Sequence, residues 1–167
     1  MEITGTRRGW ALRWLSLVGA GAASIEAQSR GGARAVRFSN PAGLSKPTGY
    51  SHVAEVMSGR TVYIAGQVAL DNDGQLVGRD DFAAQIRQVF TNLNTALASA
   101  GAVFGDVVKL NYYVVERVDR AQIAVLRETR DRFVNTQSPP VSTLVYVKDL
   151  ARADFLVEVE AMAVVRA

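Results

Sequence analysis

The sequence has 167 residues but no cysteine, a single histidine, His52, and only four prolines. Without thiols, disulfide scaffolds and zinc sites built on thiolates are excluded, and one imidazole nearly excludes a site built on histidines. A metal site would need carboxylates, and we expect neither a metal nor a cofactor. The low proline content, with 14 glycines, also excludes a collagen-like repeat.

Long apolar runs are missing as well. The apolar run at residues 15–23 is far shorter than the stretch of about 20 apolar residues that crosses a bilayer as a helix. We therefore predict no membrane span. The chain is 49% apolar and 21% charged, which is typical of one ordinary globular domain with an additional segment.

The positive charge is confined to the N-terminus. The formal net charge is +3, and residues 1–36 hold five arginines against two glutamates, which accounts for all of it. Residues 37–167 carry 14 basic and 14 acidic side chains. Because nucleic-acid binding depends on neutralising many phosphates at once, this neutral body does not favour a nucleic-acid partner.

Residues 1–32 have the parts of an export signal. Arg7 and Arg8 precede the apolar run at 15–23, and small residues precede Gln28. The paired arginines resemble the twin-arginine type of signal, which predicts a periplasmic or exported protein. The alternatives are a disordered tail or a misassigned start codon, with a cytoplasmic protein. In either case the folded domain is expected to span residues 33–167.

The body is predicted to be a single α+β domain. Two expected helices follow apolar residues spaced three or four apart, one from Asp80 or Asp81 to Gly101 and one from Asp119 to Phe133, whose Arg127, Arg130 and Asp131 are assigned to the polar side. The expected strands are 37–40, 52–57, 61–68, 107–114, 141–147 and 155–164, with 52–57 and 61–68 forming a hairpin. Both helices should pack on one face of a mixed sheet, and the other face calls for a second copy of the chain as its cover.

The last strand places two carboxylates in an apolar context. Glu158 and Glu160 are two residues apart, so they point to one side of the sheet while Val157, Val159 and Ala161 point to the other. Such a pair needs either water or a partner. It is therefore either a solvated or ion-paired face of the sheet, or the lining of a cleft whose carboxylate is tuned for proton transfer.

Several short segments occur in an order and spacing that resemble the RidA (YjgF) family, the reactive intermediate deaminases. They are Phe38 to Pro41, Gly49 to His52, Val62 to Gln67, Val108 to Leu110, Pro140 to Val147 and Val157 to Ala161. The resemblance covers about residues 37–165. It implies a chorismate-mutase-like fold and a homotrimer with ligand clefts between neighbouring subunits. It also implies hydrolysis of reactive enamines or imines, such as 2-aminoacrylate, to a keto acid and ammonia.

The resemblance also implies roles for individual residues. Glu158 falls on the glutamate that positions or activates the attacking water, whereas Glu160 is expected to be structural. Tyr50 would line the cleft with its ring or hydroxyl, unless it is a core tyrosine. In the Ser-Gly-Gln motif of the family, Ala65 replaces the serine. Gly66 is retained and would let a ligand approach the backbone, unless it serves only a β-bulge.

One departure from the family pattern concerns the substrate's charge. Deaminating members carry an arginine two residues after a proline, where it binds the substrate carboxylate, and Ser142 stands in that place after Pro140. Ser142 and Thr143 are thus the predicted substrate contacts in this strand, in addition to Ala65 and Gly66 in the segment 61–68. The lost contact is worth about 1.5–3 kcal/mol, or about tenfold to a hundredfold in binding. Three arginines could replace the charge and are otherwise surface residues: Arg117, Arg120 and Arg152.

We therefore expect a hydrolase or deaminase that acts on a small imine, enamine or related carbonyl-derived compound in an intersubunit cleft, and not on the standard 2-imino acid. The alternative is a non-catalytic trimer that binds a small molecule, which the loss of both the family arginine and the family serine favours. RNA cleavage is disfavoured by the neutral body and by the lack of a histidine pair.

Overall fold

The computed structural model describes residues 35–166. The predicted export signal or tail at 1–32 and the predicted domain boundary after residue 32 lie outside this range. Within the described range, no helix combines the length and the hydrophobicity that crossing a bilayer requires.

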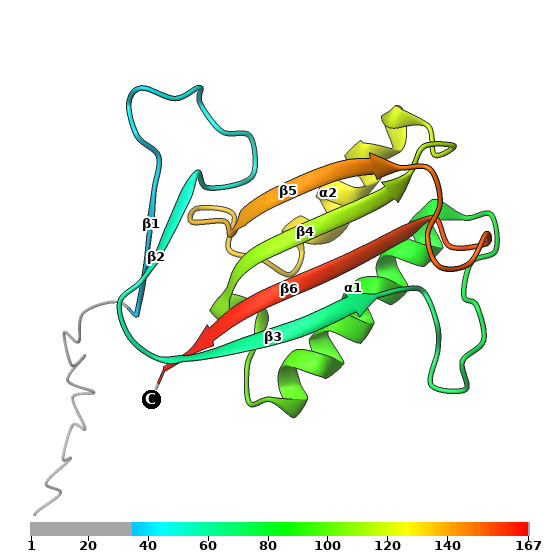
Figure 1. The fold of residues 1–167 in the computed structure, drawn as a ribbon, viewed down its shortest axis with the longest axis horizontal. Helices are drawn as coiled ribbons and strands as arrows, with labels where there is room; N and C mark the ends of the chain where they lie inside the picture. Colours follow the sequence, from blue (N-terminus) through cyan, green and yellow to red (C-terminus); the bar gives the residue numbers. More distant parts are fainter. Residues whose placement is uncertain (1–34, 167) are drawn as a thin grey trace, which may run out of the picture. The chain divides into compact units, whose positions relative to one another are not determined.

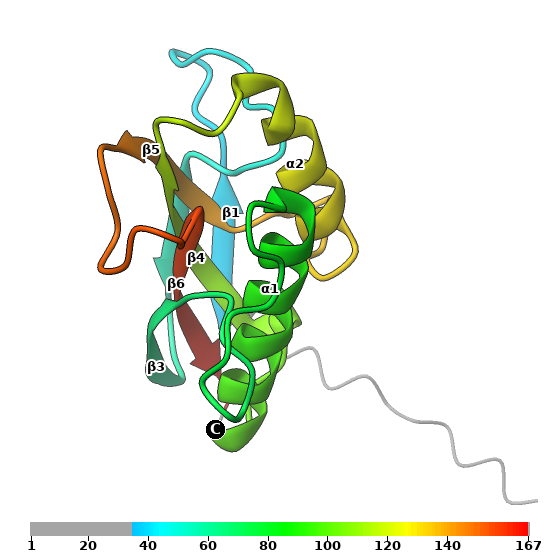
Figure 2. The same ribbon diagram turned by 90° about the vertical axis from the view of Figure 1, so that its right-hand side faces the viewer.

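The main sheet has four strands in the order β3-β6-β4-β5. β4 pairs with β5 in parallel and with β6 antiparallel, and β3 pairs with β6 antiparallel, so the sheet is mixed. Both α-helices lie on one face of this sheet (Figures 1 and 2). The bounds are β1 Val36–Ser39, β2 Val53–Val56, β3 Arg60–Gln67, β4 Val107–Val115, β5 Val141–Val147, β6 Val157–Val165, α1 Phe82–Ser99 and α2 Ile123–Asp131, with short 3₁₀ helices η1 Phe104–Asp106 and η2 Arg120–Gln122. The predicted α+β fold is confirmed.

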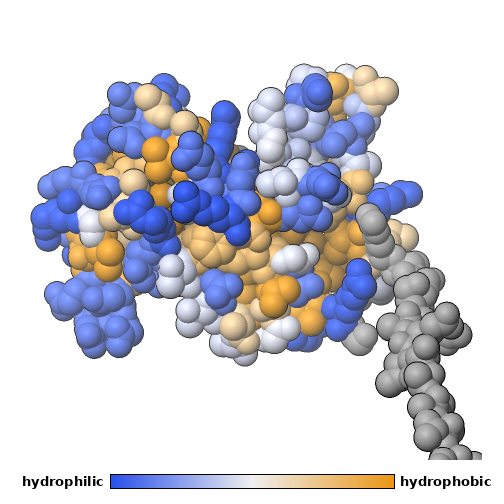
Figure 3. All heavy atoms as spheres, turned by 180° about the vertical axis from the view of Figure 1, so that it is seen from behind, coloured by the Kyte–Doolittle hydropathy of each residue, from blue (hydrophilic) through white to orange (hydrophobic). Residues whose placement is uncertain are grey.

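Helix α1 forms the centre of the core. Asp81 caps its start, since its Oδ1 accepts a hydrogen bond of 2.9 Å from the amide of Ala84. Gly101, at φ +69°, ends it in the left-handed conformation that glycine favours. The apolar residues spaced three or four apart are all buried against the sheet: Phe82, Ile86, Val89, Phe90, Leu93 and Leu97. Seen from the helix side, hydrophilic side chains surround a hydrophobic area at the middle of this face (Figure 3).

The predicted hairpin between 52–57 and 61–68 is wrong. β2 pairs with β1 in a separate two-stranded sheet, while β3 pairs with β6. Alternation identifies a strand but not its partner. The turn between β2 and β3 contains Gly59 at φ +111°, where a Cβ atom would lie 2.8 Å from the carbonyl oxygen of Val165. This turn therefore packs against the end of β6, and the chain passes from the small sheet into the large one.

The second face of the main sheet, which we call the open face, is the one turned toward the reader in Figure 1, with both helices behind it. Large apolar and aromatic side chains remain exposed on it: Tyr63 on β3 is 75% exposed and Val145 on β5 is 39% exposed. Alternation along β4 sends Leu110, Tyr112 and Val114 into the core and leaves the side chains between them on the open face.

Candidate functional site

The two glutamates of β6 share the open face, as the alternation predicts. Glu158 and Glu160 are half-buried, whereas Val157, Val159 and Ala161 are buried on the helix side. In the antiparallel pairing with β4, Glu158 stands opposite Tyr113, and Glu160 stands opposite Asn111. The neighbours of each carboxylate on this face are therefore polar side chains of β4.

Glu160 is held by hydrogen bonds across the sheet. Its Oε1 accepts from Nδ2 of Asn111 at 2.5 Å and from the hydroxyl of Tyr113 at 3.1 Å. The bond to Glu160 favours the protonated hydroxyl and raises the pKa of Tyr113 above its usual value. Both donors come from the neighbouring strand, so Glu160 fastens β6 to β4.

Glu158 lies instead against the backbone of β3. The register between β3 and β6 shifts between Ile64 and Gln67, which marks a β-bulge, and Gly66 lies within it. A Cβ atom at residue 66 would overlap Oε1 of Glu158. Gly66 thus serves the bulge and makes room for the carboxylate. Ala65 is exposed beside it, and we call Ala65, Gly66 and Glu158 the Glu158 cluster.

Tyr50 and Ser142 meet on the opposite side of the sheet. They line a cavity of about 170 Å³, which we call the Tyr50 cavity. Its walls also include Tyr112 and Leu144 from the sheet and Leu126 and Arg130 from α2. Ser51 anchors the loop that carries Tyr50, because its amide and hydroxyl donate to the carbonyl oxygens of Pro140 and Pro139 at 3.3 and 2.7 Å.

Within one chain, the Glu158 cluster and the Tyr50 cavity are not brought together. Ser142 pairs with Leu110, whose side chain enters the core, while Glu158 pairs with Tyr113, whose side chain is on the open face. Thr143 pairs with Asn111 and is exposed on the open face. The two predicted substrate contacts, Ser142 and Thr143, therefore point to opposite faces of β5.

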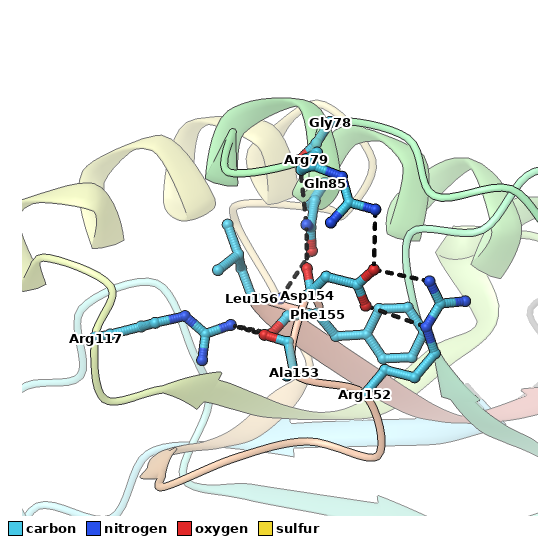
Figure 4. A network of polar contacts seen from close by, with 9 residues as sticks. All are labelled: Gly78, Arg79, Gln85, Arg117, Arg152, Ala153, Asp154, Phe155 and Leu156. Carbon is cyan, nitrogen blue, oxygen red and sulfur yellow. Dashed lines mark hydrogen bonds and ion pairs between the residues drawn. The ribbon is translucent and has the colours of Figure 1, made fainter.

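The three arginines considered as replacements for the missing charge are bound elsewhere, and Figure 4 shows two of them, Arg117 and Arg152. Arg152 makes two hydrogen bonds to the carboxylate of Asp154, through Nε at 3.1 Å and Nη2 at 2.8 Å, and these bonds lower the pKa of that carboxyl. Nη2 of Arg117 donates to the carbonyl oxygens of Ala153 at 2.5 Å and Phe155 at 3.0 Å. The guanidinium of Arg120 lies 4.1 Å from the ring centre of Tyr146.

Arg130, assigned to the polar side of the second helix, is instead buried, with only 7% of its surface exposed. It lines the Tyr50 cavity beside Ser142. Arg130 is four residues from Leu126, which is 1% exposed, so the two lie on one face of α2. This spacing was the signal that could have predicted the burial of Arg130.

Residues 35–166 contain no group of three or more histidine, aspartate or glutamate side chains arranged to hold a metal ion. The polar groups of the Glu158 cluster and the Tyr50 cavity are one carboxylate, hydroxyls and two guanidinium groups, those of Arg127 and Arg130. Such groups can bind a small organic molecule, orient water and accept a proton.

Comparisons with known proteins agree with this fold. The family model described as endoribonuclease L-PSP matches residues 43–165. Protein DfrA of Myxococcus xanthus is 31% identical over 115 residues, which are 69% of this chain and 84% of that protein. The 2-iminobutanoate/2-iminopropanoate deaminase of Mus musculus is 34% identical over 116 residues, 69% of this chain and 80% of that protein.

Solved structures show the same likeness. A Rid family protein of unknown function from Yersinia pestis is 38% identical, with a TM-score of 0.72 over 78% of this chain and 99% of that one. RidA from the Antarctic bacterium Psychrobacter is 32% identical, with a TM-score of 0.56 over 72% of this chain and 92% of that one. Motifs, fold and matches thus agree, and the chain belongs to the RidA (YjgF) family.

Proposed function

We propose that this protein hydrolyses small imines or enamines in clefts formed between the subunits of a homotrimer. The observation that carries the proposal is the carboxylate of Glu158, which lies at a glycine bulge on the open face, where its position leaves no room for a Cβ atom at residue 66. The name of the mouse relative, 2-iminobutanoate/2-iminopropanoate deaminase, supports this reaction class.

The separation of the Glu158 cluster from the Tyr50 cavity supports the proposed assembly. Within one chain the Glu158 cluster and the Tyr50 cavity lie on opposite faces of the sheet, so a substrate touching both needs two chains. The exposed Tyr63 and Val145 on the open face favour a second copy as its cover. We expect sedimentation equilibrium to give three times the monomer mass of 18.0 kDa. A strictly monomeric and active protein would contradict the intersubunit cleft.

Imine hydrolysis requires little of the protein. The nitrogen of the C=N bond first takes up a proton from solvent, and water then adds to the carbon while one of its protons passes to the carboxylate of Glu158. Glu158 returns this proton to the nitrogen of the tetrahedral intermediate, which releases ammonia as the hydroxyl group loses its proton to solvent and the carbonyl forms. Tyr50 and Ser142 would contact the substrate through their hydroxyls, and backbone amides near Gly66 or Thr143 would polarise it.

The test is ammonia release from imines generated in situ by an amino-acid oxidase. Glu158→Gln keeps the shape of the side chain but cannot accept the proton, and we expect its rate to fall about a hundredfold or more. Glu128→Gln, at an exposed position of α2, removes the same charge and should retain the wild-type rate. Equal rates for wild type and Glu158→Gln would remove Glu158 from the mechanism.

A non-catalytic binding protein is the second candidate. Two observations favour it, namely Ala65 in place of the family serine and Ser142 in place of the family arginine. Thermal-shift measurements with small carbonyl and amine compounds separate the candidates when run beside the ammonia assay. Stabilisation by a ligand without turnover of any imine would select the binding protein.

RNA cleavage, which the description of the family model names, is not favoured by this chain. The body of residues 37–167 has no excess of positive charge. Its one histidine, His52, has its Nε2 atom 2.8 Å from the carbonyl oxygen of Ser45, within a loop. Digestion of a labelled RNA by nuclease-free protein would reverse this assignment.

A further inference from the structure

The Tyr50 cavity contains a buried cation that the proposed mechanism does not use. Arg130 is 7% exposed, and its Nε and Nη2 atoms donate to a single oxygen, Oδ1 of Asp131, at 2.8 and 2.6 Å. The side chain of Asp131 is 44% exposed, so the pair is open to solvent on one side. Among residues 35–166, Nη1 of Arg130 has no hydrogen-bond acceptor. One edge of the guanidinium is thus held while donors remain for a ligand.

The loop that carries Tyr50 is shaped around this guanidinium. Gly49 has φ +80°, and a Cβ atom there would lie 2.5 Å from Nη2 of Arg130. Both the backbone conformation and the available space therefore require glycine at this position. Because Tyr50 directly follows Gly49, the position of Tyr50 depends on where the guanidinium of Arg130 lies.

A second polar group in the cavity wall has no partner. Tyr112 is 2% exposed, and its hydroxyl makes no hydrogen bond within the described residues. Burial raises the pKa of Tyr112 well above its usual value, so the hydroxyl stays protonated and can donate. A buried hydroxyl without a partner is uncommon in native proteins and calls for an explanation, such as a ligand that accepts its proton.

The charges around the cavity favour an anion. Arg127 and Arg130 both line it, and Asp131 offsets one of them. The uncharged polar side chains that line the cavity all carry hydroxyls that can donate, namely Thr48, Tyr50, Tyr112 and Ser142. The short side chain of Ser142 also leaves free the space that an arginine at that position would fill.

We propose that the Tyr50 cavity binds a small carboxylate and that Arg130, from helix α2, supplies the charge that position 142 lacks. This inference rests on the proposed function, because it assigns the acid group of that substrate. It reverses the expectation drawn from Ser142 alone, since acidic imines regain an anchor. Arg130 is then a specificity-determining residue that arrives from a different element of the fold.

The experiment compares pyruvate with pyruvamide, which have the same ketone but differ in charge, by calorimetric titration. Wild type should bind pyruvate about tenfold more tightly. Arg130→Gln should abolish this preference, and Arg132→Gln, at an exposed position two residues further along the chain with the same change of charge, should retain it. The double variant Arg130→Gln/Ser142→Arg should restore it, because it returns the charge to the family position.

Gly49→Ala provides a test that leaves every charge in place. Its methyl group would displace Nη2 of Arg130, so the preference for pyruvate should weaken several-fold even where Arg130→Gln fails to fold. Equal affinity of wild type for the two probes overturns the anion site, as does an undiminished preference in either folded variant.

The proposed reaction can fail separately. A preference for pyruvate without ammonia release from any imine supports the anion site and contradicts the hydrolase. Ammonia release without a preference for pyruvate supports the hydrolase and contradicts the anion site.

Discussion

The two faces of the sheet carry groups of opposite charge in unlike surroundings. On the open face the carboxylates of Glu158 and Glu160 are half-buried, whereas on the helix face Arg130 is almost completely buried beneath the Tyr50 loop. A half-buried carboxylate remains accessible to a reacting water molecule, while burial strengthens the directional contacts of a guanidinium. The difference indicates that the open face suits proton transfer and the Tyr50 cavity suits binding.

The faces also differ in how their groups are positioned. Glu158 is positioned by strand pairing and by the bulge at Gly66, which are features of the backbone. Arg130 depends on the packing of α2 against β5 and on the loop at Gly49. Substituting Glu158 should therefore alter the chemistry with little change in stability, whereas substituting Arg130 should alter both.

The largest expected effect comes from a substitution that displaces Glu158 on the open face. In Gly66→Ala the new methyl group would overlap Oε1 of Glu158 and push the carboxylate away from its place. We expect ammonia release to fall about a hundredfold, the contribution typical of a general base. Gly105→Ala is the matched control, because the nearest atom to its Cβ would be at an ordinary 3.8 Å. Full activity in Gly66→Ala would show that the position of Glu158 does not matter.

A smaller effect is expected from two neighbouring tyrosines of β4 that lie on opposite faces of the sheet. Tyr113→Phe removes a donor to Glu160 on the open face and should lower the free energy of unfolding. Tyr112→Phe removes a hydroxyl without a partner on the helix face, so stability should be unchanged or slightly higher. Urea unfolding measures both. A large loss in Tyr112→Phe would mean that its hydroxyl is satisfied in solution.

The smallest effect concerns the loop before β6. Hydrogen bonds from Arg152 lower the pKa of Asp154, so this carboxylate stabilises the fold above the pKa of an unfolded aspartate, about 4, and the contribution is lost as the pH falls further. Asp154→Asn should therefore have a flatter stability profile below about pH 4. Melting temperatures across this range test it, and identical profiles for the two proteins would contradict it.

Strand and helix periodicity predicted most of the scaffold because it reports burial directly. The shared face of Glu158 and Glu160 and the capped helix α1 both follow from it. The same rule, applied to the neighbours Ser142 and Thr143, would have placed them on opposite faces. The partner of β2 was not predictable in this way, since alternation carries no information about which strand lies alongside.

The burial of Arg130 could not be predicted from its residue type. Arginine is rarely buried unless paired, so it was assigned to the polar side of its helix. Its burial depends on Asp131 beside it and on Gly49, 81 residues earlier in the chain. Such a contact between distant segments arises from tertiary packing, which local sequence patterns do not encode.

The opposite orientation of Ser142 and Glu158 has a consequence for mixtures of defective chains. If each cleft takes its carboxylate from one subunit and its arginine from the next, Glu158→Gln and Arg130→Gln homotrimers are each impaired toward acidic imines. Exchanging their subunits would create some clefts in which both intact parts meet, and activity should return. Such complementation between two impaired variants would show that two chains contribute to one cleft.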